Sequence, residues 1–419
     1  MRRAAIILLA LLAGAGCSLF MPDRPRLNFT PITGSPTDYA PLVEASSATR
    51  FVLLGESTHG TLEFIVQRAR IVHAIAEARP VLAIVFEADA GEMDEAAERL
   101  RNDGAASAVE AFRNYPQWPW RSDAFRDALE SFRMIDDAET SDRQVLLIGF
   151  DFHGFSGLLD RMSTVEAPAE YTRLAKEARS CFAQFESAYS PGAGYRGPAG
   201  PCSALTASLI VAAADEADPV RRFRITHLAR TLRAAERYHL AFAGGADPWT
   251  VREQHMLRTL ASIDEYFASD EGTIIVWAHN THVGDARVTS FRPRTTLGQL
   301  LRETMPGRAY LVGMTTGRGR LRAARAIGMP STEMKLNPPL AESVEHMLAR
   351  ACRGDCLVTQ RRLGSDLNAD RASRTIGLVY RSDDELRSHY IRSIAARQFD
   401  GIVYLDETTA VDLIEPSPQ

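Results

Sequence analysis

Short apolar runs alternate along the chain with longer amphipathic stretches, beginning near Thr49. The runs are largely aliphatic and show no polar alternation, which is typical of parallel strands covered on both faces. The predicted strands are Phe51–Leu54, Val81–Phe86, Val145–Phe150, Thr273–Ala278, Ala309–Met314, Thr375–Tyr380 and Gly401–Leu405.

The stretches between these strands have helical periodicity. Alternating strands and helices predict an α/β fold with a mainly parallel sheet flanked by helices. From Gly154 to Asp270 the pattern is almost entirely helical, so we expect a helical lobe inserted at about 154–270 in one domain that spans 46–415. The predicted helices are Leu62–Arg79, Phe125–Asp136, Tyr171–Ser187, Val220–Phe242, Pro248–Ala268, Thr296–Thr304 and Ser343–Ala351.

Residues 1–17 have the pattern of a bacterial export signal. Arg2 and Arg3 precede an apolar run, Ala4–Gly16, that is short for a membrane span. The small residues before Cys17 predict cleavage and acylation at that cysteine; a plain signal peptide cut nearby is the alternative. We therefore expect an exported lipoprotein that faces the periplasm and is held to the membrane by a lipid on Cys17. Residues 18–45, with five prolines and no periodicity, predict a tether.

The net charge bears on nucleic acid as a partner, and the cysteine content bears on disulfides and metal sites. The chain has 48 Lys and Arg against 53 Asp and Glu, a formal net charge of −5, so nothing in its charge points to nucleic acid. Four cysteines follow Cys17, and an even number in an oxidising compartment favours disulfides. The most local pairing joins Cys181 to Cys202 and Cys352 to Cys356; a cysteine metal site is disfavoured because no CxxC pair exists.

Four of the predicted strands run directly into ionisable residues. The carboxyl ends of parallel strands meet at one edge of a sheet, where ligands bind, so we expect these side chains to share one crevice. A single carboxylate after a strand is often only a helix N-cap, but four such strands together favour a functional site. The residues concerned are Glu56 and His59, then Glu87, then Asp151 and His153, then His279 and His282.

These residue types suit general acid–base chemistry. An imidazole can take a proton from water at neutral pH, and a carboxylate on its other nitrogen fixes the tautomer. Glu56 and His59 lie three residues apart on a glycine-flanked turn and could form such a pair. Arg68, on the following helix, could bind a developing oxyanion, although the sequence alone favours a surface ion pair for it.

The sequence favours attack by activated water over a covalent nucleophile. It contains no Gly-x-Ser-x-Gly elbow, and the cysteines look structural. A divalent metal is the alternative, since His279 and His282 could share an ion with His59 and Glu87. The HExxH signature is absent, so no metal and no organic cofactor is predicted. The aromatic loop Trp118-Pro119-Trp120 could either wall a pocket for an apolar ligand or fold onto the core.

Several motifs resemble the erythromycin esterase family over nearly the whole chain after the tether. The two most specific are Leu54-Gly-Glu-Ser-Thr-His-Gly60 and Trp277-Ala-His-Asn-Thr-His-Val283. The resemblance implies an α/β core with a helical lobe and the hydrolysis of macrolide lactones. It further implies that His59 is the catalytic base that activates water, that Glu56 and Glu87 are essential carboxylates, and that Arg68, His279 and His282 complete the site.

The leading hypothesis is therefore a hydrolase that cleaves a small-molecule carboxylic ester or macrolide lactone with His59 as the base. Glu56 would orient His59, Glu87 would position the water or a histidine, and Arg68 with His279 or His282 would stabilise the oxyanion. Two alternatives stay open. One is a metal-dependent hydrolase. The other is a non-enzymatic lipoprotein that binds haem or another ligand, because the architecture also resembles the iron-regulated lipoproteins.

Overall fold

The structure is a computed structural model that describes residues 27–415 except 139–143, 153, 191–193, 196–201, 292–293 and 360–363. The signal segment, Cys17 and His153 thus lie outside the described residues. The central sheet has the order β1-β10-β13-β8-β2-β7-β3-β4, with β9 paired to β8. The six strands from β13 to β4 are all parallel, which confirms the predicted fold class. The strands are β1 (Thr30–Pro31), β2 (Phe51–Leu54), β3 (Val81–Asp89), β4 (Leu146–Asp151), β7 (Thr273–Trp277), β8 (Ala309–Ala324), β9 (Ser331–Lys335), β10 (Cys356–Thr359) and β13 (Gly401–Thr408).

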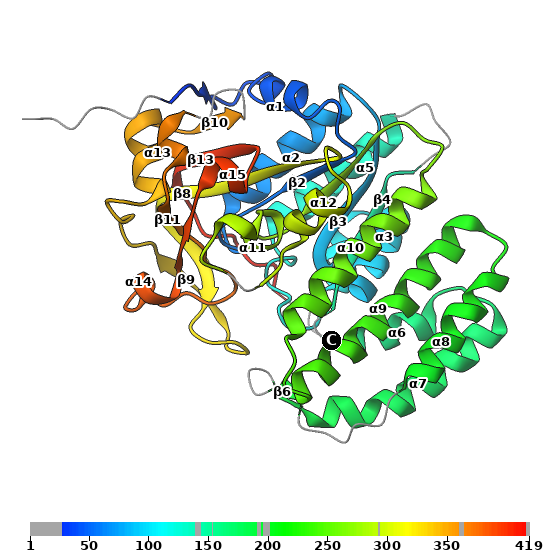
Figure 1. The fold of residues 1–419 in the computed structure, drawn as a ribbon. Helices are drawn as coiled ribbons and strands as arrows, with labels where there is room; N and C mark the ends of the chain where they lie inside the picture. Colours follow the sequence, from blue (N-terminus) through cyan, green and yellow to red (C-terminus); the bar gives the residue numbers. More distant parts are fainter. Residues whose placement is uncertain are drawn as a thin grey trace, which may run out of the picture.

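Helices cover both faces of this sheet (Figure 1). Alternate residues of a strand point to opposite faces, so Val52 and Leu54 of β2 join one core cluster while Phe51 and Leu53 join the other. The first cluster is closed by α2 (Leu62–Ala76), α3 (Ala90–Asp103) and α5 (Asp123–Ala138). The second is closed by α10 (Pro248–Tyr266), α12 (Leu297–Thr304) and α13 (Val344–Cys352).

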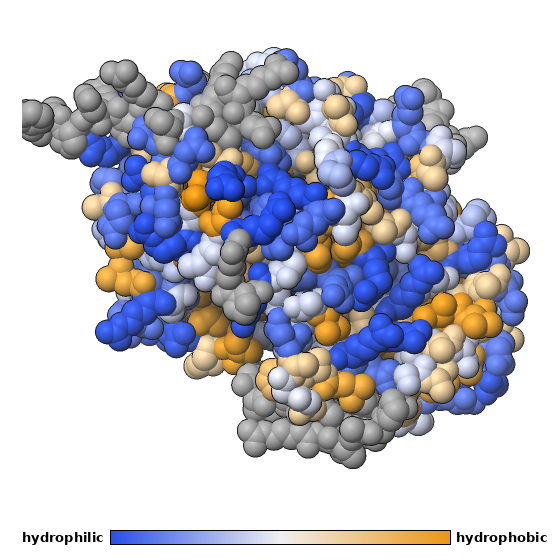
Figure 2. All heavy atoms as spheres, viewed as in Figure 1, coloured by the Kyte–Doolittle hydropathy of each residue, from blue (hydrophilic) through white to orange (hydrophobic). Residues whose placement is uncertain are grey.

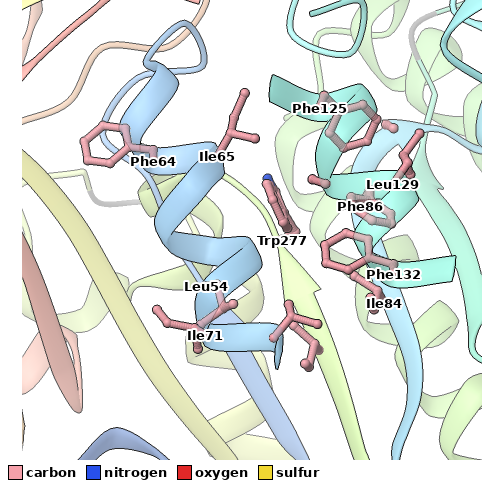
Figure 3. Close-up of a cluster of buried hydrophobic side chains, with 14 of the residues drawn as sticks. Leu54, Phe64, Ile65, Ile71, Ile84, Phe86, Phe125, Leu129, Phe132 and Trp277 are labelled. Atoms are coloured by element: carbon pink, nitrogen blue, oxygen red, sulfur yellow. The ribbon is translucent and has the colours of Figure 1, made fainter. Parts of the chain in front are cut away.

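Trp277 is the largest fully buried side chain and lies at the end of β7. Figure 3 shows its ring between Ile65 of α2 and the aromatic side chains of α5 and β3. Phe86 and Phe125 lie 5.7 and 6.2 Å from it, measured between ring centroids. Packed aromatic rings of this kind hold the carboxyl end of β7 rigidly against the first layer of helices.

The segment between β4 and β7 is mostly helical, with a third hydrophobic cluster of its own. Four of its helices form a lobe beside the sheet, at the lower right of Figure 1, whereas α10 packs against the sheet. Phe152 and Ala90 belong to the same cluster and join the lobe to the carboxyl ends of the strands. The lobe helices are α6 (Ser156–Thr164), α7 (Ala169–Ala188), α8 (Ser203–Ala212) and α9 (Pro219–Ala243).

The folded chain begins earlier than the pattern predicts. Within the expected tether of residues 18–45, β1 pairs with β10, and α1 (Ala40–Ala45) follows. Tyr39 and Leu42 are fully buried in the first core cluster. Short segments of this kind carry no periodicity of their own because tertiary contacts hold them in place.

The predicted strand Thr375–Tyr380 is wrong. The strand there is β11 (Arg371–Arg374), paired with β12 (Tyr390–Ser393) in a separate antiparallel sheet. Residues 375–378 are irregular, and the backbone N–H of Ile376 donates to the carbonyl oxygen of Ser57 at 2.7 Å. This apolar stretch therefore serves as a loop against the β2 turn.

Two further features concern the cysteines and membrane spans. Disulfides join Cys181 to Cys202 and Cys352 to Cys356, the pairing that the sequence favours. In the part of the chain that the structure covers, none of the helices has the length and apolar character needed to cross a bilayer.

Candidate active site

The carboxyl ends of β2, β3, β4 and β7 bring the predicted site residues together. They meet at a cavity of about 310 Å³ whose walls include His59, Glu87, His279 and His282. The turn after β2 approaches β7 so closely that a Cβ on Gly55 would lie 2.1 Å from Asn280 Oδ1. Only glycine fits there, and this packing places Glu56 and His59 next to the histidines that follow β7.

His59, Glu56 and Arg68 form a chain of hydrogen bonds at one wall. His59 Nδ1 lies 2.9 Å from Glu56 Oε1, and Arg68 Nη2 donates to Glu56 Oε2 at 2.5 Å. A carboxylate only accepts, so Nδ1 carries the proton and Nε2 of a neutral His59 is left with its lone pair. The side chain of His59 is 11% exposed. This is the tautomer and the degree of exposure that a general base requires.

Arg68 does not form the surface ion pair that its sequence context favours. It is 1% exposed, and its guanidinium carbon lies 4.1 Å from the centroid of the Trp277 ring. Burial lowers the pKa of Arg68 to about 10, against the opposing charges of Glu56 and Glu87. Arg68 lies behind Glu56 and does not line the cavity, so it holds the carboxylate and does not contact a ligand in the cavity.

Glu87 connects the histidine segment after β7 to helix α10. Its Oε2 accepts from the backbone N–H of His279 at 2.7 Å, and its Oε1 accepts from Arg252 Nη2 at 2.9 Å. Burial raises the pKa of Glu87, but the hydrogen-bonded charge of His282 and the charge of Arg252 outweigh burial and hold that pKa well below its usual range. Glu87 is therefore ionised, and it links the backbone of His279 to Arg252.

His282 is held between two buried carboxylates. Its Nδ1 donates to Glu253 Oε1, and its Nε2 lies 3.0 Å from Glu87 Oε1. Burial lowers the pKa of His282, but the charges of Glu253 and Glu87 raise it to about 9. Arg252 Nη1 lies 3.1 Å from the same Nε2, yet a nitrogen that donates to Glu87 has no lone pair left to accept. We therefore assign His282 as an imidazolium at neutral pH.

His279, unlike His282, is neutral. Its Nε2 lies 3.2 Å from the carbonyl oxygen of Ile376, which only accepts, so Nε2 carries the proton. Its Nδ1 then accepts from the backbone N–H of Thr281 at 3.2 Å. Burial lowers the pKa of His279 to about 3. Its ring centroid lies 5.0 Å from that of His59. His279 is a neutral, oriented imidazole in the cavity wall.

Helix α10 supplies residues that the sequence reasoning missed. Trp249, Arg252 and Glu253 come from its first two turns; Trp249 and Arg252 line the cavity, and the Trp249 ring stacks on His282 at 4.7 Å between centroids. Arg252 Nε donates to Asp151 Oδ1 at 2.8 Å, so Asp151 also belongs to this network. The sequence signal was weak: Trp249 lies two residues after the N-cap Asp247, and the charged pair Arg252-Glu253 lies within the second turn. Helical periodicity assigns such charges to solvent.

The aromatic loop Trp118-Pro119-Trp120 both lines the cavity and packs onto the core. Trp120 lines the cavity and also packs edge-on against Phe86 in the core, with 6.2 Å between ring centroids. Pro116 and Pro119 line the cavity beside it, whereas Trp118 is buried elsewhere. One wall of the cavity is therefore apolar.

The charge on His282 predicts a pH-dependent stability. A pKa raised to about 9 in the folded state, above the usual value near 6.5, stabilises the fold fully below pH 6.5. We expect that contribution, on the order of a few kcal/mol at most, to disappear as the pH rises through 9. Urea unfolding at pH 6.5, 8 and 9.5 measures it.

The matched control for this pH dependence is His282→Asn, which should be less stable at pH 6.5 and lose less stability than the parent as the pH rises. Equal slopes of unfolding free energy against pH in the two proteins would contradict the assignment of an imidazolium.

The described residues contain no group of three or more His, Cys, Asp or Glu side chains arranged to hold a metal ion. The four residues of the metal alternative, His59, Glu87, His279 and His282, face one cavity but are engaged with each other and with other protein groups. Both ring nitrogens of His279 and of His282 have protein partners. Binding an ion there would require these hydrogen bonds to be given up.

Three solved structures share the fold over nearly the whole chain. A succinoglycan biosynthesis protein is 18% identical, with 92% of this chain and 96% of that chain covered and a TM-score of 0.69. A protein from Bacillus cereus is 16% identical, with 92% and 97% covered and a TM-score of 0.70. A mutant of the erythromycin esterase EreC in its open conformation is 16% identical, with 93% and 99% covered and a TM-score of 0.63.

The sequence itself matches the model of one protein family, described as erythromycin esterase, over residues 80–408. The match includes Glu87, His279 and His282, while Glu56, His59 and Arg68 precede it. The matched segment covers well over half of the 419 residues. The chain therefore belongs to the erythromycin esterase family.

Proposed function

We propose that this protein hydrolyses a small-molecule carboxylic ester or lactone with water activated by His59. The observation that carries the proposal is the hydrogen-bonded chain Arg68–Glu56–His59, which ends at the wall of the 310 Å³ cavity. Membership of the erythromycin esterase family supports a hydrolase and a macrolide as its substrate.

His59 acts as base and then as acid in the proposed reaction. Its Nε2 takes a proton from a water molecule as the water oxygen attacks the carbonyl carbon. Glu56, which accepts from Nδ1–H, stabilises the imidazolium that forms. When the tetrahedral intermediate collapses, the carbon–oxygen bond to the leaving group breaks and His59 returns the proton to the departing oxygen. The products are a carboxylic acid and an alcohol, joined in one molecule if the substrate is a lactone.

The geometry changes the role expected for Arg68. Because Arg68 lies behind Glu56, we assign it to positioning that carboxylate. Arg252, Arg294 and His282 are positive groups that line the cavity. We propose that the charges of Arg252 and His282 stabilise the oxyanion. Glu87 holds both of them in place through its Oε1.

The volume and the lining of the cavity limit how much of a substrate it can enclose. Its volume of about 310 Å³ lies at the lower end of the range for sites that bind drug-sized ligands, which is roughly 300–1,000 Å³. Trp120, Trp249 and Phe291 supply apolar walls. We propose that the cavity encloses the ester group and its neighbouring atoms, with the rest of a larger substrate outside.

Hydrolysis in ¹⁸O-labelled water tests whether water cleaves the bond between the acyl carbon and the leaving-group oxygen. Purified protein is incubated with erythromycin and with a panel of simple esters, with and without EDTA, and the products are analysed by mass spectrometry. We expect one ¹⁸O atom in the carboxylic acid, none in the alcohol, and the same rate with EDTA. Failure to cleave any ester or lactone would contradict the hydrolase proposal, and loss of the rate with EDTA would favour the metal-dependent alternative.

We also propose that the protein is an exported lipoprotein acylated on Cys17, on the basis of the sequence pattern alone. Replacing Cys17 with alanine should move the protein from the membrane fraction to the soluble fraction, because the lipid would be its only anchor. Fractionation of cells that express the parent and the C17A variant measures this. Membrane association unchanged in the variant would contradict acylation at this residue.

A further inference from the structure

A groove between α9 and α10 concentrates positive charge away from the catalytic cavity. It encloses about 860 Å³ and shares no lining residue with that cavity. Glu265 is the one acidic residue among those that line it. In Figure 2, hydrophilic side chains cover much of the face over α9 and α10. The arginines that line the groove are Arg222, Arg230, Arg233 and Arg237 from α9 and Arg258 from α10.

Three of these arginines lack a close acceptor among the residues that the structure describes, although Arg233 and Arg237 lie within electrostatic reach of Glu236. Arg233, Arg237 and Arg258 form no hydrogen bond or ion pair there, and Arg233 Nε is buried without an acceptor. Arg224 on the same helix is, by contrast, paired with Asp94 at 2.6 Å. Unpaired guanidinium groups in a groove offer donors in a geometry suited to carboxylate or phosphate oxygens.

The arginines also repel each other. Arg230, Arg233 and Arg237 are spaced three and four residues apart, so they project from one face of α9, where neighbouring like charges destabilise a helix. Burial lowers the pKa of Arg258, and the charge of Arg237 lowers it further, which places the two guanidinium groups within electrostatic reach across the groove. A bound anion would relieve this repulsion.

Apolar side chains supply about half of the remaining groove lining, beside polar residues that include His227, His255 and Ser262. Phe223 and Ala234 of α9, Ala261 and Tyr266 of α10, and Ile210 of α8 all contribute to it. An inorganic anion would leave this surface unused, whereas a ligand with a hydrocarbon chain would bury it.

We propose that the groove binds an anionic amphiphile, a single hydrocarbon chain with an acidic head. The chain packs on the apolar side chains between α9 and α10, and the head accepts hydrogen bonds from the arginines. This binding site is additional to the proposed hydrolase cavity and does not depend on it.

Isothermal titration calorimetry with laurate below its micelle concentration tests this proposal on the whole protein. We expect one laurate per chain and weaker binding of two probes that each lack one feature: inorganic phosphate, without a chain, and dodecyl maltoside, without a charge. Dodecyl phosphate should bind at least as well as laurate. The triple variant R233Q/R237Q/R258Q should bind laurate at least about tenfold more weakly, because each charged hydrogen bond contributes to affinity.

R173Q is the matched control, because Arg173 is an exposed helical arginine of the same lobe and is paired with Glu170 and Glu177. It should bind laurate as the parent does. The triple variant should melt no lower than the parent since it removes repulsion, and R237Q alone provides a second test if the triple variant does not fold. Laurate affinity unchanged in R237Q and in a folded triple variant, or dodecyl maltoside or phosphate binding as tightly as laurate, would overturn the proposal.

Discussion

Replacing His59 with asparagine is expected to lower kcat for ester or lactone hydrolysis by roughly 100- to 10,000-fold, the range typical of losing a general base. Asparagine keeps a polar side chain on the turn after β2, but its amide cannot take a proton from water. KM should change much less than kcat, because His59 acts on the water and contributes little to substrate binding. Initial rates over a range of substrate concentrations separate these two effects.

The control for this prediction is His346→Asn, on α13 and outside the cavity. It should hydrolyse the same substrate at the parent rate. Circular dichroism and the melting temperature of both variants should match those of the parent. An H59N protein that is folded and retains the parent kcat would remove His59 from the role of base.

Replacing Arg68 with methionine is expected to lower the free energy of unfolding by about 3–5 kcal/mol, as for other buried ion pairs that lose one partner. The substitution leaves the Glu56 carboxylate, itself 3% exposed, without its closest cationic partner. It also removes the guanidinium from the face of the Trp277 ring. Urea unfolding monitored by tryptophan fluorescence measures the loss.

Two further variants separate the charge effect from the packing effect. R68M/E56Q removes both charges and should recover most of the lost stability, though not the activity, because Glu56 also orients His59. R126M removes an exposed arginine paired with Asp123 and should cost under about 1 kcal/mol. An R68M protein no less stable than R126M would contradict the buried ion pair.

Periodicity was sufficient to predict most of the sheet, because strands buried on both faces need continuous apolar runs. β2, β3, β4, β7, β8 and β13 all come from such runs. The same rule failed for Thr375–Tyr380, where apolar residues pack as a loop against the turn after β2. A short apolar segment has the same pattern whether it pairs as a strand or is held by neighbouring elements.

The site residues at the ends of strands could be predicted from the sequence, whereas those on helices could not. Glu56, Glu87 and His279 lie at the carboxyl ends of parallel strands, and the topology of the sheet places these ends at one edge. Arg252 and Glu253 are charged residues within a helix, and their burial depends on Glu87, Asp151 and His282 from three other segments. Arg68 is similar, since only the fold reveals that Glu56 and Trp277 enclose it.

Helix α10 has one end in each of two sites: Trp249 and Arg252 at the catalytic cavity, and Arg258 and Tyr266 in the arginine groove. If a ligand displaces α10 at one end, the hydrogen-bonded helix carries that displacement to the other end. Thermodynamic linkage then makes the coupling reciprocal: an amphiphile that tightens substrate binding by some factor must itself bind more tightly by that same factor once the substrate is present.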